Sequence, residues 1–208
     1  MNDKLSKLFG SSARVKIIRL FMLNPETVYS LKEISQRAKV PAASARREIS
    51  LLKSIGLVRP KTEKFTEELK LKDGKIKTKK VEMNGFVLNQ LFPFLFPLKN
   101  LVLNSTPLDK EKLIKNLGAA GKVKLMILSG IFTNNEGSSS VDLLLVGDAI
   151  NESKLDRALK NVEAELGKEI VYAVFSTKDF MYRYGMYDKF VREIMESPHE
   201  KVVNRLSI

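Results

Sequence analysis

Cysteine is absent from this 208-residue chain, and histidine occurs once, at His199. The lack of cysteine excludes disulfides, thiolate zinc sites and cysteine nucleophiles, and one histidine excludes a multi-histidine metal site. No run of about eighteen apolar residues is present, so we expect no membrane-spanning helix. The N-terminal sequence MNDKL lacks the apolar core of a signal peptide, and we therefore expect a cytoplasmic protein. We also expect no bound cofactor or metal.

Acidic residues are scarce in the first half of the chain. Met1–Asn104 holds 21 basic and 9 acidic residues, whereas Ser105–Ile208 holds 15 of each, so the net charge of +12 belongs entirely to the first half. This distribution is typical of a polyanion-binding module joined to a neutral domain. Nucleic acid is favoured over a membrane surface, because no basic amphipathic helix with a bulky aromatic face is evident.

Local signals predict three helices in the first half. Apolar residues are dense over Ser12–Leu23, which predicts a helix buried on most sides, capped by Ser11 or Ser12 and ended at Asn24-Pro25. After a short β-like pair at Val28-Tyr29, Ser30 and Glu33 form a predicted capping box, and the second helix runs to about Ala38 and buries Leu31 and Ile34. Pro41 suits the first position of the third helix, which is expected over Pro41–Ile55 and ends at Gly56.

The third helix has two different faces. Ala45, Ile49 and Leu52 follow the spacing of a stripe that faces the core. Ala43, Arg46, Arg47 and Ser50 share another face, where small residues frame two guanidinium groups. Small side chains allow a helix to approach base edges closely, and arginine can bind guanine or a phosphate with two hydrogen bonds.

A lysine-rich β-hairpin is predicted next. A strand begins at Leu57–Arg59 and leads through Pro60 into 67–72, Asp73-Gly74 supplies a hairpin turn, and a second strand covers Lys75–Met83. Gly85–Asn89 is expected to form one more short strand. The hairpin lysines are Lys70, Lys72, Lys75, Lys77, Lys79 and Lys80.

The run LKEISQRAKVPAASARREISLLKSIGLV, followed by this hairpin, resembles the winged helix-turn-helix regulators of the ArsR-like kind. The resemblance covers about Leu8 to Leu88 and implies a recognition helix followed by a β-hairpin, or wing, whose lysines contact the DNA backbone. The residues expected to contact DNA are Ser30, Lys32, Ala42, Ala43, Ser44, Arg46, Arg47, Ser50, Lys75, Lys77 and Lys79.

The second half is predicted to be an α/β domain joined through an apolar helix. The segment Phe92–Leu103 is unusually apolar and is expected to dock the two halves or to pair two subunits, whereas a binding pocket is the less favoured alternative. Helices are then expected over 107–117 and 152–166, after a cap at Ser176, and over 187–196, with strands over 123–128, 141–146 and 169–175. The expected boundaries are 1–90 for the winged helix, 91–105 for the connecting helix and 106–208 for the α/β domain.

The stretch LSGIFTNNEGSSSVDLLLVGD resembles the minimal nucleotidyltransferase family, which carries Gly-Ser on a turn, Asp-x-Asp on a strand and a third carboxylate on a later strand. Alternate residues on a strand share a face, so the Asp pair can hold magnesium. Gly130 and Asp142 match this pattern, but Ile131 replaces the serine, Ser140 replaces the first Asp, and Val171 is nearest the third carboxylate. Glu136 and Asp148 are expected in the preceding loop and beyond the strand end, so we expect a catalytically inactive domain.

These features together predict a two-domain protein of the α+β or α/β class. Its expected function is that of a transcriptional regulator that binds double-stranded DNA as a homodimer. The nucleotidyltransferase-like domain would serve dimerisation or the sensing of an unidentified small-molecule or nucleotide effector. Two alternatives remain open at this stage: a nucleotidyltransferase enzyme guided to its substrate by the winged helix, and an RNA-binding protein.

Overall fold

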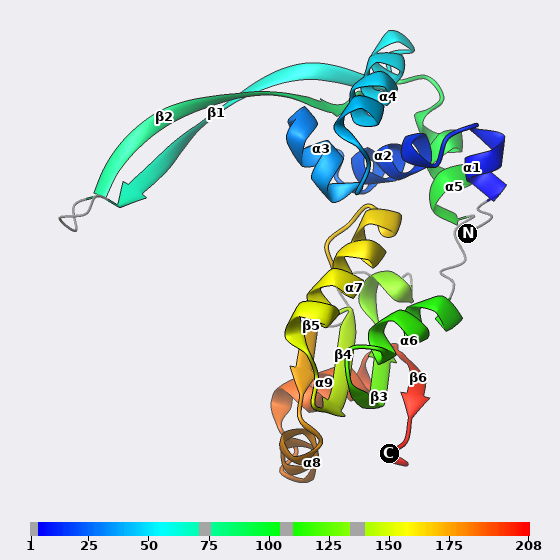
Figure 1. The fold of residues 1–208 in the computed structure, drawn as a ribbon, viewed down its shortest axis with the longest axis vertical. Coiled ribbons are helices and arrows are strands. Elements are labelled where there is room, and N and C mark those ends of the chain that lie inside the picture. The colour runs from blue at the N-terminus through cyan, green and yellow to red at the C-terminus, as the bar shows by residue number, and fades with distance from the viewer. Residues whose placement is uncertain (1–3, 71–75, 105–109, 134–139) are drawn as a thin grey trace. The chain divides into compact units, whose positions relative to one another are not determined.

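The computed structural model describes residues 4–70, 76–104, 110–133 and 140–208. The chain divides into two compact units: unit 1 is Met1–Thr106 with Ala164–Lys168, and unit 2 is Pro107–Glu163 with Glu169–Ile208. The described residues form a mixed α+β structure with two small sheets, a two-stranded one in unit 1 and a four-stranded one in unit 2 (Figure 1). No helix in this part of the chain is long and apolar enough to cross a membrane.

Unit 1 is built on helices that pack around one apolar core. Its helices are α1 (Lys4–Leu8), α2 (Ser12–Leu23), α3 (Leu31–Arg37), α4 (Ala42–Ser54) and α5 (Leu95–Asn104). The prediction that Ser12–Leu23 is buried on most sides is confirmed, because Ile17, Ile18, Leu20, Phe21 and Met22 of α2 all belong to the core. The short helix α1 was not predicted.

The predicted helix ends of unit 1 are largely correct. Ser11 caps α2, since its hydroxyl accepts a hydrogen bond from the Arg14 amide at 3.1 Å. The Ser30–Glu33 capping box is present at the start of α3. Gly56 has a φ of 81°, the left-handed conformation that a side chain disfavours, and so it ends α4 without strain. The expected start of this helix at Pro41 is wrong by one residue. Pro41 is the N-cap residue, and α4 begins after it, at Ala42.

The hairpin is longer and more continuous than predicted. Strands β1 (Val58–Lys70) and β2 (Ile76–Leu88) pair antiparallel along their whole length, from Val58↔Leu88 to Lys70↔Ile76. At roughly 3.3 Å per residue, each 13-residue strand extends about 43 Å. The separate short strand expected at Gly85–Asn89 is instead the end of β2, and the predicted Asp73-Gly74 turn lies outside the described residues.

Pro60 does not interrupt β1, because Phe86, its partner on β2, needs no hydrogen bond from the backbone nitrogen of residue 60. Phe86 faces Pro60 across the ribbon, and it exchanges both backbone hydrogen bonds with Tyr29 on its other side, each at 2.9 Å. The Val28-Tyr29 pair was thus correctly expected to be extended. Gly85 is required beside this bridge, since a Cβ atom there would lie 2.7 Å from the Tyr29 carbonyl oxygen.

The apolar segment expected over Phe92–Leu103 forms α5 only from Leu95 onward. One side of it joins the core of unit 1, where Val102 is fully buried and Leu98 is partly buried. Phe94 and Phe96 of this segment are open to solvent instead, with exposed fractions of 67% and 75%.

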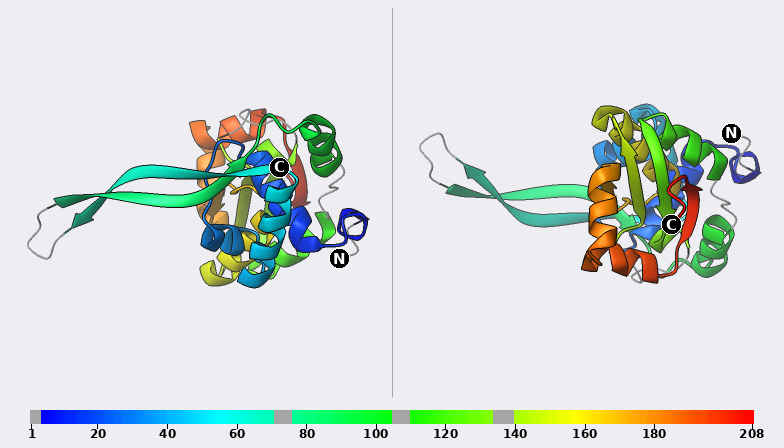
Figure 2. Two further views of the ribbon diagram at one scale, coloured as in Figure 1. Left: turned by 90° about the horizontal axis from the view of Figure 1, so that it is seen from above. Right: turned by 90° about the horizontal axis from the view of Figure 1, so that it is seen from below.

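Unit 2 contains a four-stranded sheet with its helices. Its elements are α6 (Lys110–Gly118), β3 (Lys122–Leu128), the 3-10 helix η1 (Gly130–Phe132), β4 (Leu143–Asp148), α7 (Glu152–Leu166), β5 (Tyr172–Phe175), α8 (Thr177–Gly185), α9 (Lys189–Glu196) and β6 (Glu200–Asn204), and the last three residues of α7 belong to unit 1. The strand order is β5-β4-β3-β6, in which β5 is parallel to β4 and the other neighbours are antiparallel. Figure 2 shows β6 at one edge of this sheet.

Two expectations about these strands are wrong, and a further strand was missed. Strand β4 covers Leu143–Asp148 instead of 141–146, so Asp148 is its last residue and does not lie beyond its end. Strand β5 begins at Tyr172 instead of 169, because the backbone of Val171 bonds to Asp142 before the ladder starts. The edge strand β6 was missed, since five residues of mixed polarity give too short an alternation to recognise.

Candidate nucleic-acid interface

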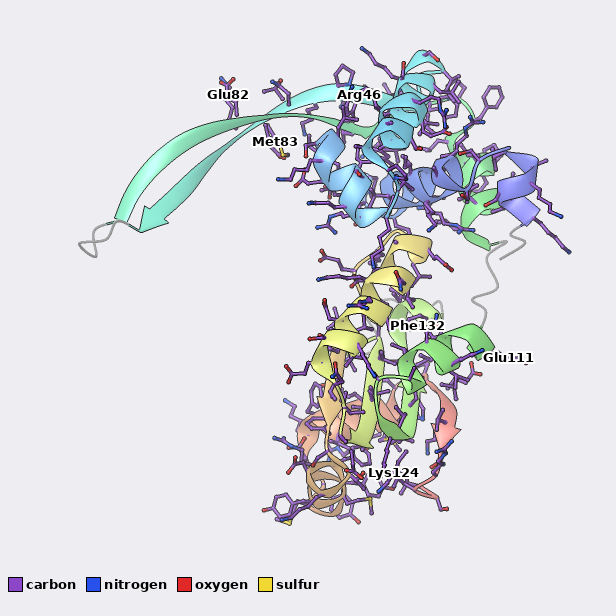
Figure 3. The ribbon with its side chains drawn as sticks, viewed as in Figure 1. Arg46, Glu82, Met83, Glu111, Lys124 and Phe132 are labelled. Carbon is purple, nitrogen blue, oxygen red and sulfur yellow. The ribbon has the colours of Figure 1, made fainter. Side chains whose placement is uncertain are left out.

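Helix α4 has the two faces that its sequence predicts. Ala45, Ile49 and Leu52 are buried in the core of unit 1. The face formed by Ala43, Arg46, Arg47 and Ser50, here called the α4 face, is exposed at all four positions. Figure 3 labels Arg46 on this helix. Arg46 makes no ion pair with another described residue, so its guanidinium group can bind a ligand.

The remaining helical residues of the predicted site divide into two groups. Lys32 and Ala42 are exposed and Ser44 is half-buried, so they can extend the α4 face. Ser30 has a structural task, because its hydroxyl donates to the Glu33 carboxylate at 2.7 Å and accepts from the Glu33 amide at 3.3 Å. Its hydroxyl is therefore occupied in capping α3.

The predicted hairpin residues are described in part. Lys75 lies outside the described residues, and only the backbone of Lys77 and Lys79 is described, in β2, opposite Leu69 and Glu67. Neighbouring residues of a strand point to opposite sides, as Glu82 and Met83 do in Figure 3.

Glu48 is a residue of the site that the sequence analysis missed. Its side chain is buried between the N-terminal end of α2 and the middle of α4, where it accepts hydrogen bonds from Ser11 Oγ at 2.7 Å and Arg14 Nε at 2.8 Å. Burial raises the pKa of Glu48, but the hydrogen bonds from Ser11 and Arg14 and the charges of Arg14 and Arg47 together hold that pKa below 4.5. A signal was present, since Glu48 falls in the core-facing stripe between Ala45 and Ile49.

The Glu48 cluster fixes the orientation of α4. Ser11 is the N-cap of α2, and Arg14 lies in the first turn of that helix and also donates to the Phe9 carbonyl oxygen at 2.7 Å. One carboxylate on α4 thereby fastens the helix to two residues at the start of α2. Because Arg47 directly precedes Glu48 in the chain, this attachment determines the direction in which the α4 face points.

Unit 2 brings Asp142 together with Gly130, Ile131 and Val171, the positions that the sequence analysis compared with the nucleotidyltransferase pattern. Asp142 accepts hydrogen bonds from the Ile131 amide at 2.9 Å and the Val171 amide at 3.0 Å. A side chain at Gly130, which has a φ of 52°, would collide with the same carboxylate. Asp142 thus joins η1, β4 and the start of β5, and each of its oxygens is bound by a backbone amide.

Among the described residues, Asp142 belongs to no group of three metal-ligating side chains. Ser140 is exposed. Asp148 is engaged elsewhere, by Lys124 Nζ at 2.9 Å and by the Thr177 amide and hydroxyl, and these hydrogen bonds lower the pKa of Asp148. Glu136 lies outside the described residues.

Comparisons with protein-family models, with curated proteins and with solved structures found no match for this chain.

Proposed function

We propose that this protein is a DNA-binding transcriptional regulator of the cytoplasm, in which α2, α3, α4 and the β1–β2 hairpin act as a winged helix-turn-helix. The observation that carries the proposal is the α4 face, where two exposed arginines are framed by alanine and serine on a helix whose opposite side is buried. The charge excess of the first half supports it, since a basic module gains affinity by releasing counterions from the phosphates.

Duplex DNA fits this face better than duplex RNA does. A helix about 10–12 Å across can enter the major groove of B-DNA, which is about 12 Å wide. The 13 residues of α4 give it a length of about 20 Å. The major groove of A-form RNA is too narrow for side chains to read. Arg46 and Arg47 would meet base edges or phosphates, with Ala43 and Ser50 allowing the close approach.

The hairpin would act through the DNA backbone. Replacing Lys75, Lys77 and Lys79 by glutamine should weaken binding to all duplexes to a similar extent, because lysine–phosphate pairs do not read sequence. The slope of log affinity against log salt should shrink by roughly one unit for each phosphate that is no longer neutralised. Fluorescence anisotropy with duplex DNA and a structured RNA, at several salt concentrations, measures both effects.

A matched control for that experiment is Lys154→Gln, which removes an exposed charge from α7 in unit 2. It should leave the salt slope unchanged. A triple variant with altered sequence preference and an unchanged slope would contradict the backbone role. Tighter binding of the wild type to the RNA than to any duplex would replace the DNA proposal by the RNA-binding one.

For unit 2 we propose a nucleotidyltransferase-like domain without catalytic activity. The transfer reaction needs metal ions held by several carboxylates to neutralise the developing charge. Asp142 is a single carboxylate, and two backbone amides already bind its oxygens. Formation of a labelled product from nucleoside triphosphates, abolished by Asp142→Ala, would contradict this proposal.

The regulator would bind DNA as a homodimer through the exposed side of α5. A single recognition helix covers few base pairs, so helix-turn-helix proteins gain affinity by pairing on two half-sites. Replacing Phe94 and Phe96 together by serine should convert a dimer at tens of micromolar into a monomer without unfolding unit 1, because both side chains are mostly exposed. Light scattering measures the mass of each variant.

Leu8→Ser is the matched control for that pair, since Leu8 is a similarly exposed apolar residue on α1. It should leave the dimer intact. A wild-type protein that remains monomeric both free and on DNA would refute the dimer.

A further inference from the structure

A basic groove lies in unit 2, between α6 and the β3–β6 edge of the sheet. Four cationic residues line it: Lys115 on α6, Lys122 and Lys124 on β3, and Arg205 directly after β6. Ile114 and Val203 form part of its apolar wall, and Gly118, where an added Cβ would meet no atom within 4 Å, also lines it. We refer to this hollow as the α6–β6 groove.

The α6–β6 groove is lined by positive charges, although it belongs to the electrically neutral half of the chain. The second half of the chain has no net charge, and no acidic residue of the described chain lines the groove. Lys124 is paired with Asp148, but Lys115, Lys122 and Arg205 make no ion pair with another described residue. Glu111 lies one turn before Lys115 on α6 but makes no ion pair with it. Lys115, Lys122 and Arg205 therefore line one groove without an ion pair to a described acidic residue.

The groove is separate from the motif around Asp142. Lys124 lies near the start of β3, whereas Gly130 follows the end of that strand. Six residues of extended chain separate the two positions by about 20 Å. A ligand in the α6–β6 groove is thus not the ligand that the nucleotidyltransferase-like motif would hold.

We propose that the α6–β6 groove binds a small phosphorylated ligand with an apolar or planar group, of which a nucleoside triphosphate is the simplest example. Lys115, Lys122 and Arg205 would bind the phosphate oxygens, since charge-assisted hydrogen bonds are the strongest that these side chains form. Ile114 and Val203 would contact the planar group. The proposal uses only residues of unit 2 and does not depend on DNA binding by unit 1.

Isothermal titration calorimetry of the full-length protein with ATP, without magnesium, tests the proposal. The wild type should bind ATP, and Lys115→Ala/Arg205→Ala should bind it at least about tenfold more weakly, because two charged hydrogen-bond donors are removed. Inorganic pyrophosphate should bind more weakly than ATP, since it lacks a group that can contact Ile114 and Val203. Circular dichroism would verify that the double variant is folded.

Two control variants locate the binding. Arg46→Ala/Arg47→Ala removes the same number of charges from the α4 face, and Lys154→Ala removes one from α7; both should bind ATP like the wild type. Absence of ATP binding, unchanged affinity in Lys115→Ala/Arg205→Ala, or an equal decrease in either control would overturn the assignment. Equal affinities for pyrophosphate and ATP would overturn the role of the apolar wall.

Discussion

A variant in which Arg46 and Arg47 are both replaced by alanine should bind its DNA site about a hundredfold more weakly than the wild type. Each arginine that binds a base edge contributes roughly 1–3 kcal/mol, and its removal also relaxes the preference at one base position. Both side chains are exposed and outside the core stripe of α4, so the fold of unit 1 should be unaffected. Fluorescence anisotropy at fixed salt measures the affinity, and circular dichroism checks the helix content.

Lys4→Ala/Lys7→Ala provides the control of equal charge change, on the exposed surface of α1. It tests whether the effect depends on position or only on net charge. If the two double variants were weakened equally, the arginines would contribute only to the general attraction of a basic protein for DNA. If neither were weakened, α4 would not be the recognition helix.

The helices of unit 1 were predictable because their signals are local. Ser30 and Glu33 are three residues apart, Gly56 directly follows the last turn of α4, and the core stripe repeats within a single helix. Such features depend on neighbours in the sequence. The exposed α4 face was predictable for the same reason, since helical periodicity alone separates Arg46 and Arg47 from Ile49 and Leu52.

Features that depend on distant contacts were missed or predicted incorrectly. Strand β1 can continue through Pro60 because the backbone groups of Phe86 bond to Tyr29. Tyr29 and Phe86 are 57 positions apart in the chain but adjacent in the fold. The late start of β5 follows from the bonds between Val171 and Asp142. Neither contact can be read from a local pattern, because each joins segments that only the folded chain brings together.

Glu48 illustrates both kinds of information. Its place in the core stripe is a local signal that a carboxylate will be buried, which ordinarily costs free energy unless the group is paired. Its partners Ser11 and Arg14 lie 37 and 34 positions earlier in the chain, so the pairing itself was not predictable. A charged residue inside an apolar stripe therefore indicates that a partner exists without identifying it.

Replacing Glu48 by alanine should destabilise unit 1 by about 2–4 kcal/mol, because it leaves the charge of Arg14 without its carboxylate partner and opens a space beside α2. Arg14 is itself 29% exposed, which lets water replace part of the missing interaction and keeps the effect below that of a fully buried pair. Glu26→Ala, at an exposed position, should change the stability by no more than about 0.5 kcal/mol. Hydrogen exchange of amides in α4, read by mass spectrometry, assigns the destabilisation to unit 1 and excludes unit 2 as its source.

The same carboxylate should make the stability of unit 1 depend on pH. Because folding lowers the pKa of Glu48 below 4.5, its contribution is fully present above about pH 4.5 and is lost as the pH falls through the folded value. Protection of the α4 amides should therefore decrease more steeply below pH 4.5 in the wild type than in Glu48→Gln, which keeps the acceptor oxygen but cannot ionise. Glu48→Gln should also bind DNA better than Glu48→Ala at pH 7, since it retains hydrogen bonds that orient the α4 face. Identical pH profiles for the wild type and Glu48→Gln, together with native-like exchange in Glu48→Ala, would show that α4 is held by its apolar stripe alone.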